Sequence, residues 1–163
     1  MFARIGPAQP AQGADVVARA VAALALAALA VIHVVDLPGT LGPTPLVGAG
    51  YLAIIAAAVL TGGAMIARSH WLAWAAAGGV AAAAMGGYVL TRAVPGGFLG
   101  DHADVGNWRC PLGIAALSVE AILILLVVLA AWQARVQARR VAPLSLPAPA
   151  RPRTPEFSPR RAG

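Results

Sequence analysis

Glu120 stands out chemically, because its carboxyl group lies within a long apolar stretch near the end of the chain. It lies about 12 Å along a predicted helix that begins at Leu112, since a helix rises 1.5 Å per residue. An ionisable side chain near the middle of a bilayer is costly, so it faces other helices and usually has a partner. Arg92 and His33 are the candidate partners. The open interpretations are a buried ion pair, a protonated carboxyl group that fixes the helix register, and a proton or ion pathway.

Other polar residues are expected to gather at one end of the molecule. His33 and Asp36 are three residues apart and share a helix face if the helix extends that far. Histidine and carboxylate can bind zinc or copper, but this spacing matches no metal-ligand pattern. Haem held by two histidines is not expected, since only His33 lies in a span. The remaining polar side chains occur in one long loop: Arg92, Asp101, His102, Asp104, Asn107, Trp108, Arg109 and Cys110.

Sequence patterns of known enzymes are absent. No Ser-His-Asp or Cys-His arrangement can be assembled, and no glycine-rich phosphate loop is present. Cys110 is the only cysteine, which excludes a disulfide within the chain. We therefore expect no enzymatic activity, no cofactor and no metal site.

The composition indicates helices that cross a membrane. Of the 163 residues, 60% are hydrophobic and 11% are charged, whereas a soluble domain carries about a quarter charged residues. Crossing about 30 Å of hydrocarbon takes about 20 apolar residues in a helix, whose backbone groups pair within the segment. Four stretches qualify, and they predict an all-α integral membrane four-helix bundle over residues 16–133. The predicted spans are 16–35, 46–67, 71–90 and 112–132, separated by segments rich in turn residues.

The arginines predict the orientation of these spans. All twelve basic residues are arginine, a bias typical of a GC-rich bacterial genome. Ten of them fall on the side of the two termini, and only Arg92 and Arg109 fall on the other side. Because positive charge collects on the cytoplasmic side, both termini are predicted to be cytoplasmic, in a bacterial cytoplasmic membrane.

Two segments outside the bundle complete the predicted organisation. Residues 1–15 form a cytoplasmic N-terminal segment, unless cleavage near residue 30 removes them with the first span as a signal peptide. Residues 134–163 contain seven arginines and six prolines and are predicted to be a disordered cytoplasmic tail. This tail accounts for the net charge of +6, so nucleic acid is not an expected partner. Lipid head groups are expected to contact Arg135, Arg139 and Arg140, each contact contributing about 1 kcal/mol.

Small residues recur at intervals of four in two of the spans. Such spacing lets helix backbones approach closely, and packing drives helix association in lipid. The contact is expected either within the bundle or with a second polypeptide. The predicted helix-packing residues are Gly79, Ala83, Gly87, Gly50 and Gly62.

The loop and the start of the last span resemble a family of small actinobacterial four-helix membrane proteins. The matching segments are Thr91-Arg92-Ala-Val-Pro95-Gly96, Asp104-Val-Gly-Asn-Trp108, Pro111-Leu-Gly113 and Ser118-Val-Glu120. The family carries an acid immediately before the proline, where this chain has Cys110. The resemblance implies the four-span topology and the importance of Arg92, Trp108 and Glu120, and it implies no reaction.

Taken together, these features predict a membrane protein without catalytic activity, an accessory or scaffold subunit. Its expected partners are the lipid bilayer and another integral membrane protein or a second copy of itself. The alternative is a protein that binds a metal, a quinone or a lipid in a polar pocket on the extracytoplasmic side. A second alternative is a small proton-coupled transporter that uses Glu120. The candidate ligand or ion-pair cluster is His33, Asp36, Arg92, His102, Asp104, Trp108 and Glu120.

Overall fold

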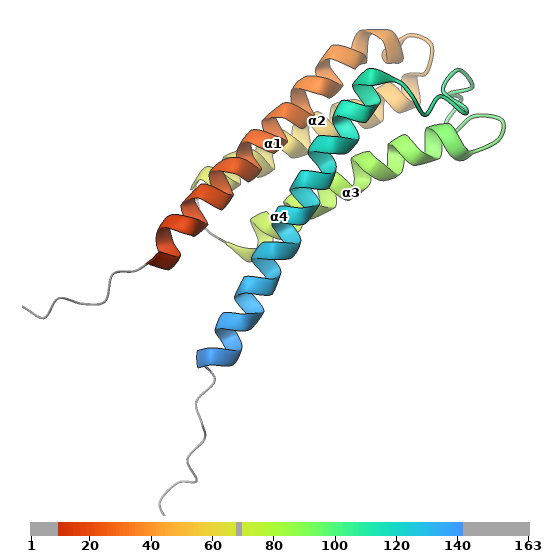
Figure 1. Ribbon diagram of the computed structural model, residues 1–163. Helices are drawn as coiled ribbons and strands as arrows, with labels where there is room; N and C mark the ends of the chain where they lie inside the picture. The colour runs from red at the N-terminus through yellow and green to blue at the C-terminus, as the bar shows by residue number, and fades with distance from the viewer. Residues whose placement is uncertain (1–9, 68–69, 142–163) are drawn as a thin grey trace, which may run out of the picture.

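The structure is a computed structural model that describes residues 10–67 and 70–141. The described residues form four long helices, α1 (Pro10–Leu41), α2 (Pro45–Ala67), α3 (Trp71–Ala93) and α4 (Pro111–Val141), drawn in Figure 1. All four are long and apolar enough to cross a membrane. The predicted all-helical fold with four such helices is therefore confirmed, and helices of this kind suggest a multi-pass membrane protein.

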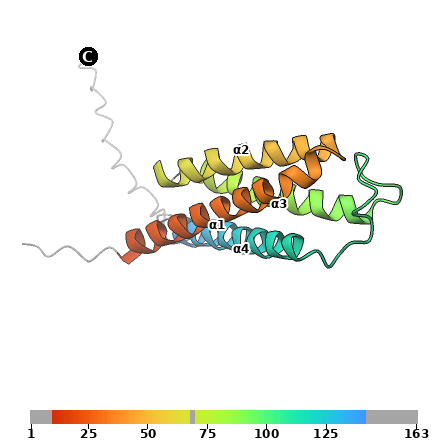
Figure 2. The ribbon, with the colours of Figure 1, turned by 90° about the horizontal axis from the view of Figure 1, so that it is seen from above.

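The helices run up and down and form a ring in which each contacts two neighbours. α1 packs on α2, α2 on α3, α3 on α4, and α4 returns to α1. The start of α1 and the end of α4 lie at one end of the bundle, which we call the terminal end (Figure 1). The opposite end carries the connection between α1 and α2 and the segment 94–110, and we call it the loop end (Figure 2).

Small side chains bring the helices close together in the core. The largest fully buried apolar side chains are Leu26, Leu29, Met65 and Leu123, surrounded mainly by alanines. Gly62 of α2 faces Leu26 of α1, whose Cβ lies 3.8 Å from the place a Cβ would take at that glycine. Large apolar side chains such as Leu24, Leu60 and Leu125 are instead exposed on the outer surface, where lipid is a suitable solvent.

α1 is longer than the predicted first span, because the helix continues through Pro38 to Leu41. Hydroxyl groups support this extension: the Thr40 side chain donates to the Asp36 carbonyl oxygen, at 3.0 Å. The extension keeps Asp36 helical and on the same face as His33, as their spacing predicted.

Other helix ends also extend beyond the predicted spans. α3 continues to Ala93, so Arg92 lies in its last turn. α4 continues to Val141, so the first eight residues of the expected tail, 134–141, are helical. Likewise residues 10–15 of the expected N-terminal segment belong to α1. The remainder of both terminal segments, residues 1–9 and 142–163, lies outside the described residues.

The segment 94–110 folds back on the end of α3. It contains four glycines with positive φ angles between 77° and 89°, a backbone region that favours glycine. Gly97 is the most constrained, because a Cβ there would lie 2.8 Å from both the Asp101 carbonyl oxygen and the His102 Nδ1 atom. The Gly106 N–H donates to the Arg92 carbonyl oxygen at 3.0 Å, which returns the chain to the helix end.

Candidate functional site

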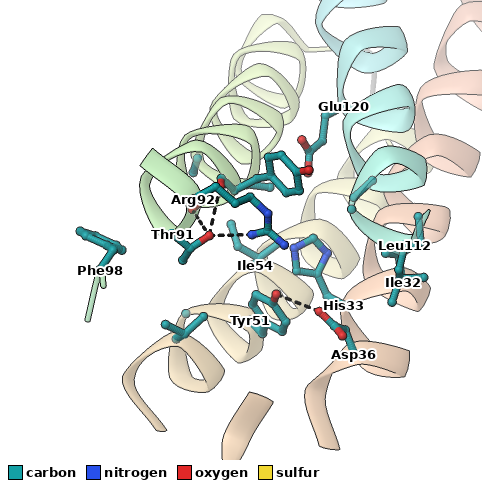
Figure 3. A pocket seen from close by; sticks show the side chains of 18 of the residues that line it. Ile32, His33, Asp36, Tyr51, Ile54, Thr91, Arg92, Phe98, Leu112 and Glu120 are labelled. Atoms are coloured by element: carbon teal, nitrogen blue, oxygen red, sulfur yellow. Dashed lines mark hydrogen bonds between the residues drawn. The ribbon is translucent and has the colours of Figure 1, made fainter. Parts of the chain in front are cut away.

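A pocket of about 330 Å³ lies at the loop end, between all four helices and the segment 94–110 (Figure 3). Its size is at the lower end of the range for small-molecule sites. The walls are mostly apolar, with contributions from Ile54, Phe98 and Leu112. The polar and titratable side chains among its lining residues are His33, Asp36, Tyr51, Tyr88, Thr91, Arg92, Cys110 and Glu120.

Arg92 is buried at one side of this pocket, and its polar atoms are already paired. Its Nη2 atom lies 3.1 Å from Asp104 Oδ2, an ion pair that neutralises the guanidinium charge. Its Nε atom donates to the Asn107 carbonyl oxygen at 3.2 Å, and Nη1 donates to Thr91 Oγ1 at 2.6 Å. The guanidinium carbon also lies 3.8 Å from the centre of the Tyr88 ring, a cation–π contact. Arg92 therefore fastens the loop to α3.

Glu120 lies deeper in the pocket and has no such partner. Its side chain is 1% exposed, and within the described part of the chain Oε2 has no hydrogen-bond partner. Arg92, one of its two candidate partners, forms its ion pair with Asp104 instead. No ion pair joins Glu120 to His33 among the described residues either. A buried polar group left unpaired costs about 1–3 kcal/mol, and this carboxyl group lines the pocket with no partner at Oε2 within the described residues.

His33 and Asp36 of α1 form the third part of the site with Tyr51 of α2. His33 Nδ1 lies 2.9 Å from the Leu29 carbonyl oxygen, a contact in which Nδ1 carries a proton and donates. The Tyr51 hydroxyl donates to Asp36 Oδ2 at 2.9 Å. The rings of His33 and Tyr51 meet edge to face, with centroids 4.8 Å apart. These contacts fix the side chains of α1 and α2 around the pocket (Figure 3).

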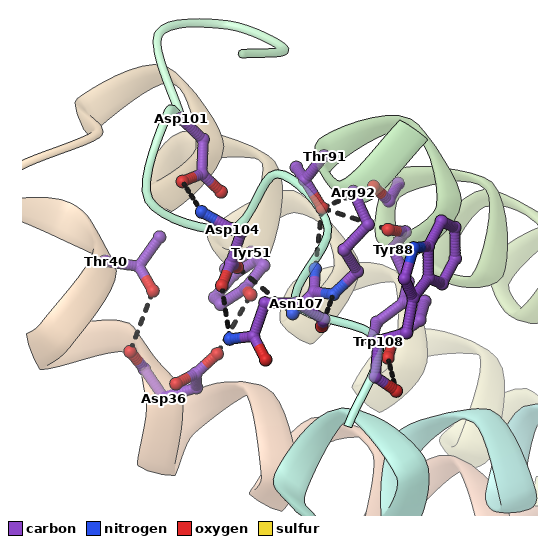
Figure 4. Close-up of polar contacts among 11 residues, drawn as sticks. Asp36, Thr40, Tyr51, Tyr88, Thr91, Arg92, Asp101, Asp104, Asn107 and Trp108 are labelled. Atoms are coloured by element: carbon purple, nitrogen blue, oxygen red, sulfur yellow. Dashed lines mark hydrogen bonds and ion pairs between the residues drawn. The ribbon is translucent and has the colours of Figure 1, made fainter. Parts of the chain in front are cut away.

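The acidic loop residues have a structural role (Figure 4). Asp101 Oδ1 accepts a hydrogen bond from the Asp104 N–H at 3.2 Å. Asn107 Nδ2 donates to Asp104 Oδ1 at 3.3 Å, which orients this carboxylate toward Arg92. Burial, and next the nearby charge of Asp104, raise the pKa of the Asp101 carboxyl above its ordinary value of 3.8.

Tyr88 connects the loop to the pocket wall. Its hydroxyl donates to the Trp108 carbonyl oxygen at 3.1 Å, and the two rings lie 6.1 Å apart. The ring also fills the space above Gly113 of α4, where an added Cβ would overlap it. One aromatic ring thus contacts Arg92, the loop and α4.

The predicted cluster is only partly brought together. His33, Asp36, Arg92 and Glu120 line the pocket. Asp104 and Trp108 instead hold the loop, and His102 is exposed outside the pocket. Within the described residues no three His, Cys, Asp or Glu side chains are arranged to hold a metal ion.

Sequence reasoning missed several residues of the site. Tyr51 and Tyr88 both line the pocket, and neither belonged to the predicted cluster. The spacing of Tyr88 and Arg92, four residues apart on one helix, is a signal that could have joined them. Thr91 and Cys110 also line the pocket, and Cys110 is half-buried as a free thiol.

The predicted packing and lipid-contact residues lie in different surroundings. Only Gly62 faces a neighbouring helix closely, through Leu26. Gly50, Ala83 and Gly87 line the pocket, and a Cβ at Gly79 would meet nothing within 4 Å. On the last turns of α4, Arg135 and Arg139 are exposed, and the side chain of Arg140 lies outside the described part.

No family model matches the chain, and no curated protein or solved structure matches it. The functional argument therefore depends on the pocket and its side chains.

Proposed function

We propose that this is a non-catalytic multi-pass membrane protein that binds a small amphiphilic molecule in the pocket at its loop end. The observation that carries the proposal is the deeply buried carboxyl group of Glu120, unpaired at Oε2, in a pocket of about 330 Å³. Pockets that bind small molecules combine apolar walls with a few fixed polar groups. Here Arg92, Tyr51 and His33 are held by hydrogen bonds, so the polar groups are fixed before a ligand arrives.

The proposal includes the orientation in the membrane. Ten of the twelve arginines belong to the side of the terminal end, which favours a cytoplasmic location for that end. The loop end then faces the extracytoplasmic side of a bacterial cytoplasmic membrane. The resemblance to small actinobacterial membrane proteins agrees with this orientation and stays a prediction.

Two glycines of α3 provide a matched test of the pocket. Gly87 lines it and Gly79 does not, although both have open space above the backbone and they are eight residues apart. Gly87→Leu is expected to fill the pocket, while Gly79→Leu adds the same side chain outside it. Native mass spectrometry of protein extracted from its own membranes should find a small-mass adduct on the wild type and on Gly79→Leu. The adduct should be lost from Gly87→Leu, and an adduct retained by that variant would contradict the proposal.

An accessory or scaffold subunit is the second candidate. It is favoured by the exposed small residues Ala75 and Gly79 on α3, which leave a helix surface open to close approach. In the same spectra, Gly79→Leu should then release a partner polypeptide or a second copy of the chain. A partner that stays bound to this variant would exclude this surface as the contact.

A further inference from the structure

The charges around the pocket do not balance. Two carboxyl groups, those of Asp36 and Glu120, line it together with one guanidinium group, that of Arg92. Arg92 is already neutralised by Asp104, at 3.1 Å and outside the pocket lining. The pocket therefore has an excess of acidic groups, and an acidic group withdrawn from water is stabilised by a cation.

The hydrogen-bonding groups of the pocket give a second reason to expect a ligand that carries a hydrogen-bond donor. Several donors of the pocket already have acceptors: each guanidinium nitrogen of Arg92 contacts one acceptor, and the Tyr51 hydroxyl donates to Asp36. The pocket-lining atom that is buried without a partner, within the described residues, is the Glu120 carboxyl oxygen Oε2. A carboxylate oxygen accepts hydrogen bonds, so a complementary ligand supplies a donor.

The apolar walls of the pocket indicate that the ligand also has a hydrocarbon part. Next to the acidic groups are aromatic rings, those of Tyr51 and Phe98, and aliphatic side chains such as Ile54 and Leu112. Aromatic faces attract cations, and aliphatic walls favour hydrocarbon. A hydrated metal ion would leave these walls unused.

From these observations we infer that the ligand is an amphiphilic amine, whose ammonium group binds Glu120 and whose hydrocarbon part fills the apolar wall. This inference rests on the proposed ligand-binding function and names the chemical class of the ligand. An ammonium group supplies three N–H donors and one positive charge, which matches the unpaired carboxyl group of Glu120. Asp36 lies in the same pocket and adds to the negative potential there.

A matched pair of probes tests the inference on the full-length protein in lipid nanodiscs. We would titrate 2-phenylethylamine, which is protonated at neutral pH, and its neutral analogue 2-phenylethanol by calorimetry. The wild type should bind the amine at least about tenfold more tightly, which corresponds to about 1.4 kcal/mol. Equal affinity for the amine and the alcohol would overturn the inference.

Three variants separate the ligand class from the pocket itself. Glu120→Gln keeps the shape and removes the charge, so it should abolish the preference for the amine while the alcohol still binds. Asp101→Asn removes an acid that does not line the pocket and should leave the preference unchanged. Gly87→Leu should abolish binding of both probes. If the wild type binds neither probe and no adduct is found, the proposed function fails; if both bind equally and only Gly87→Leu prevents it, the ligand class alone fails.

The lipid composition of the nanodiscs identifies the source of the amine. Adding phosphatidylethanolamine to phosphatidylglycerol discs should weaken binding of 2-phenylethylamine about tenfold if a lipid head group is the natural ligand. Unchanged affinity would assign the site to a free amine. Both results support an ammonium ligand, whereas stronger binding of the amine after this addition would contradict a shared site.

Discussion

The two ends of the bundle are built from the same kinds of residues but use their polar groups differently. At the terminal end, Arg19 donates from Nη1 to the Met65 carbonyl oxygen at 3.2 Å and pairs with Asp15 at 3.1 Å. The contact with Met65 joins the start of α1 to the last turn of α2, and the pair with Asp15 lies within α1. At the loop end, Arg92 plays a similar structural part, but Glu120 is left over. Within the described residues, the loop end alone combines a buried unpaired acid with a pocket, which is why the proposed function is assigned to that end.

The hollows at the two ends of the bundle also differ in the side chains that line them. A hollow also exists toward the terminal end, between α2 and α3, but Ala64, Ala67, His70, Leu72 and Ala73 line it, with no acid. In the middle of the bundle, Leu26 and Leu123 are fully buried. The bundle is thus closely packed in its middle and hollowed toward both ends, with acidic groups lining the hollow at the loop end.

Truncating a leucine should give the largest difference in stability between the middle of the bundle and the loop end. Leu26→Ala removes a fully buried side chain, and we expect the free energy of unfolding to fall by about 2–4 kcal/mol. Leu112→Ala removes the same atoms from the wall of an existing pocket and should cost less than half as much. Reversible unfolding in mixed micelles would measure both values, and equal losses would mean that the loop end is packed as tightly as the core.

The ion pairs of the two ends provide the next comparison. Asp104→Asn leaves the Arg92 guanidinium, whose side chain is 6% exposed, without its counter-ion. We expect the free energy of unfolding to fall by about 1–2 kcal/mol, a moderate value because the Asp104 carboxylate is partly exposed. Hydrogen exchange should become faster across residues 94–110.

Asp15→Asn is the matched control at the terminal end. The Asp15 side chain is 42% exposed, so solvent screens its pair with Arg19 and the change should cost well under about 1 kcal/mol. A larger loss for this variant than for Asp104→Asn would reverse the comparison.

The smallest expected effect concerns pH at the loop end. Because burial raises the pKa of Asp101 above 3.8, the folded state binds this proton more tightly than the unfolded state does. This residue therefore makes the protein less stable as the pH rises from 3.8 through its raised pKa, and the cost persists at neutral pH. Asp101→Asn keeps an oxygen that can accept from the Asp104 N–H but does not titrate. As the pH rises through the acidic range, the midpoint temperature of thermal unfolding of the wild type should therefore decrease relative to that of this variant. Parallel curves for the two proteins would refute the raised pKa of Asp101.

Much of the fold followed from the sequence, because each helix satisfies its own backbone and depends mainly on apolar length. The shared face of His33 and Asp36 and the burial of Glu120 also followed from spacing and hydropathy. The pairing of Arg92 did not, because it depends on a loop path set by glycines with positive φ angles. The spacing of small residues likewise could not tell which of two neighbouring stripes on α3 packs against another helix. A Cβ at Gly78 would lie 3.2 Å from Val127, whereas Gly79, one residue on, faces open space.

The position of Tyr88 couples the pocket to the loop mechanically. Its ring lies between the Arg92 guanidinium and Gly113, and its hydroxyl holds the Trp108 carbonyl oxygen. A molecule that rotates this ring would at once disturb a cation–π contact and a loop hydrogen bond. Under the proposed function, occupancy of the pocket would thus reach the loop through one side chain, and the fluorescence of the neighbouring Trp108 indole would report it.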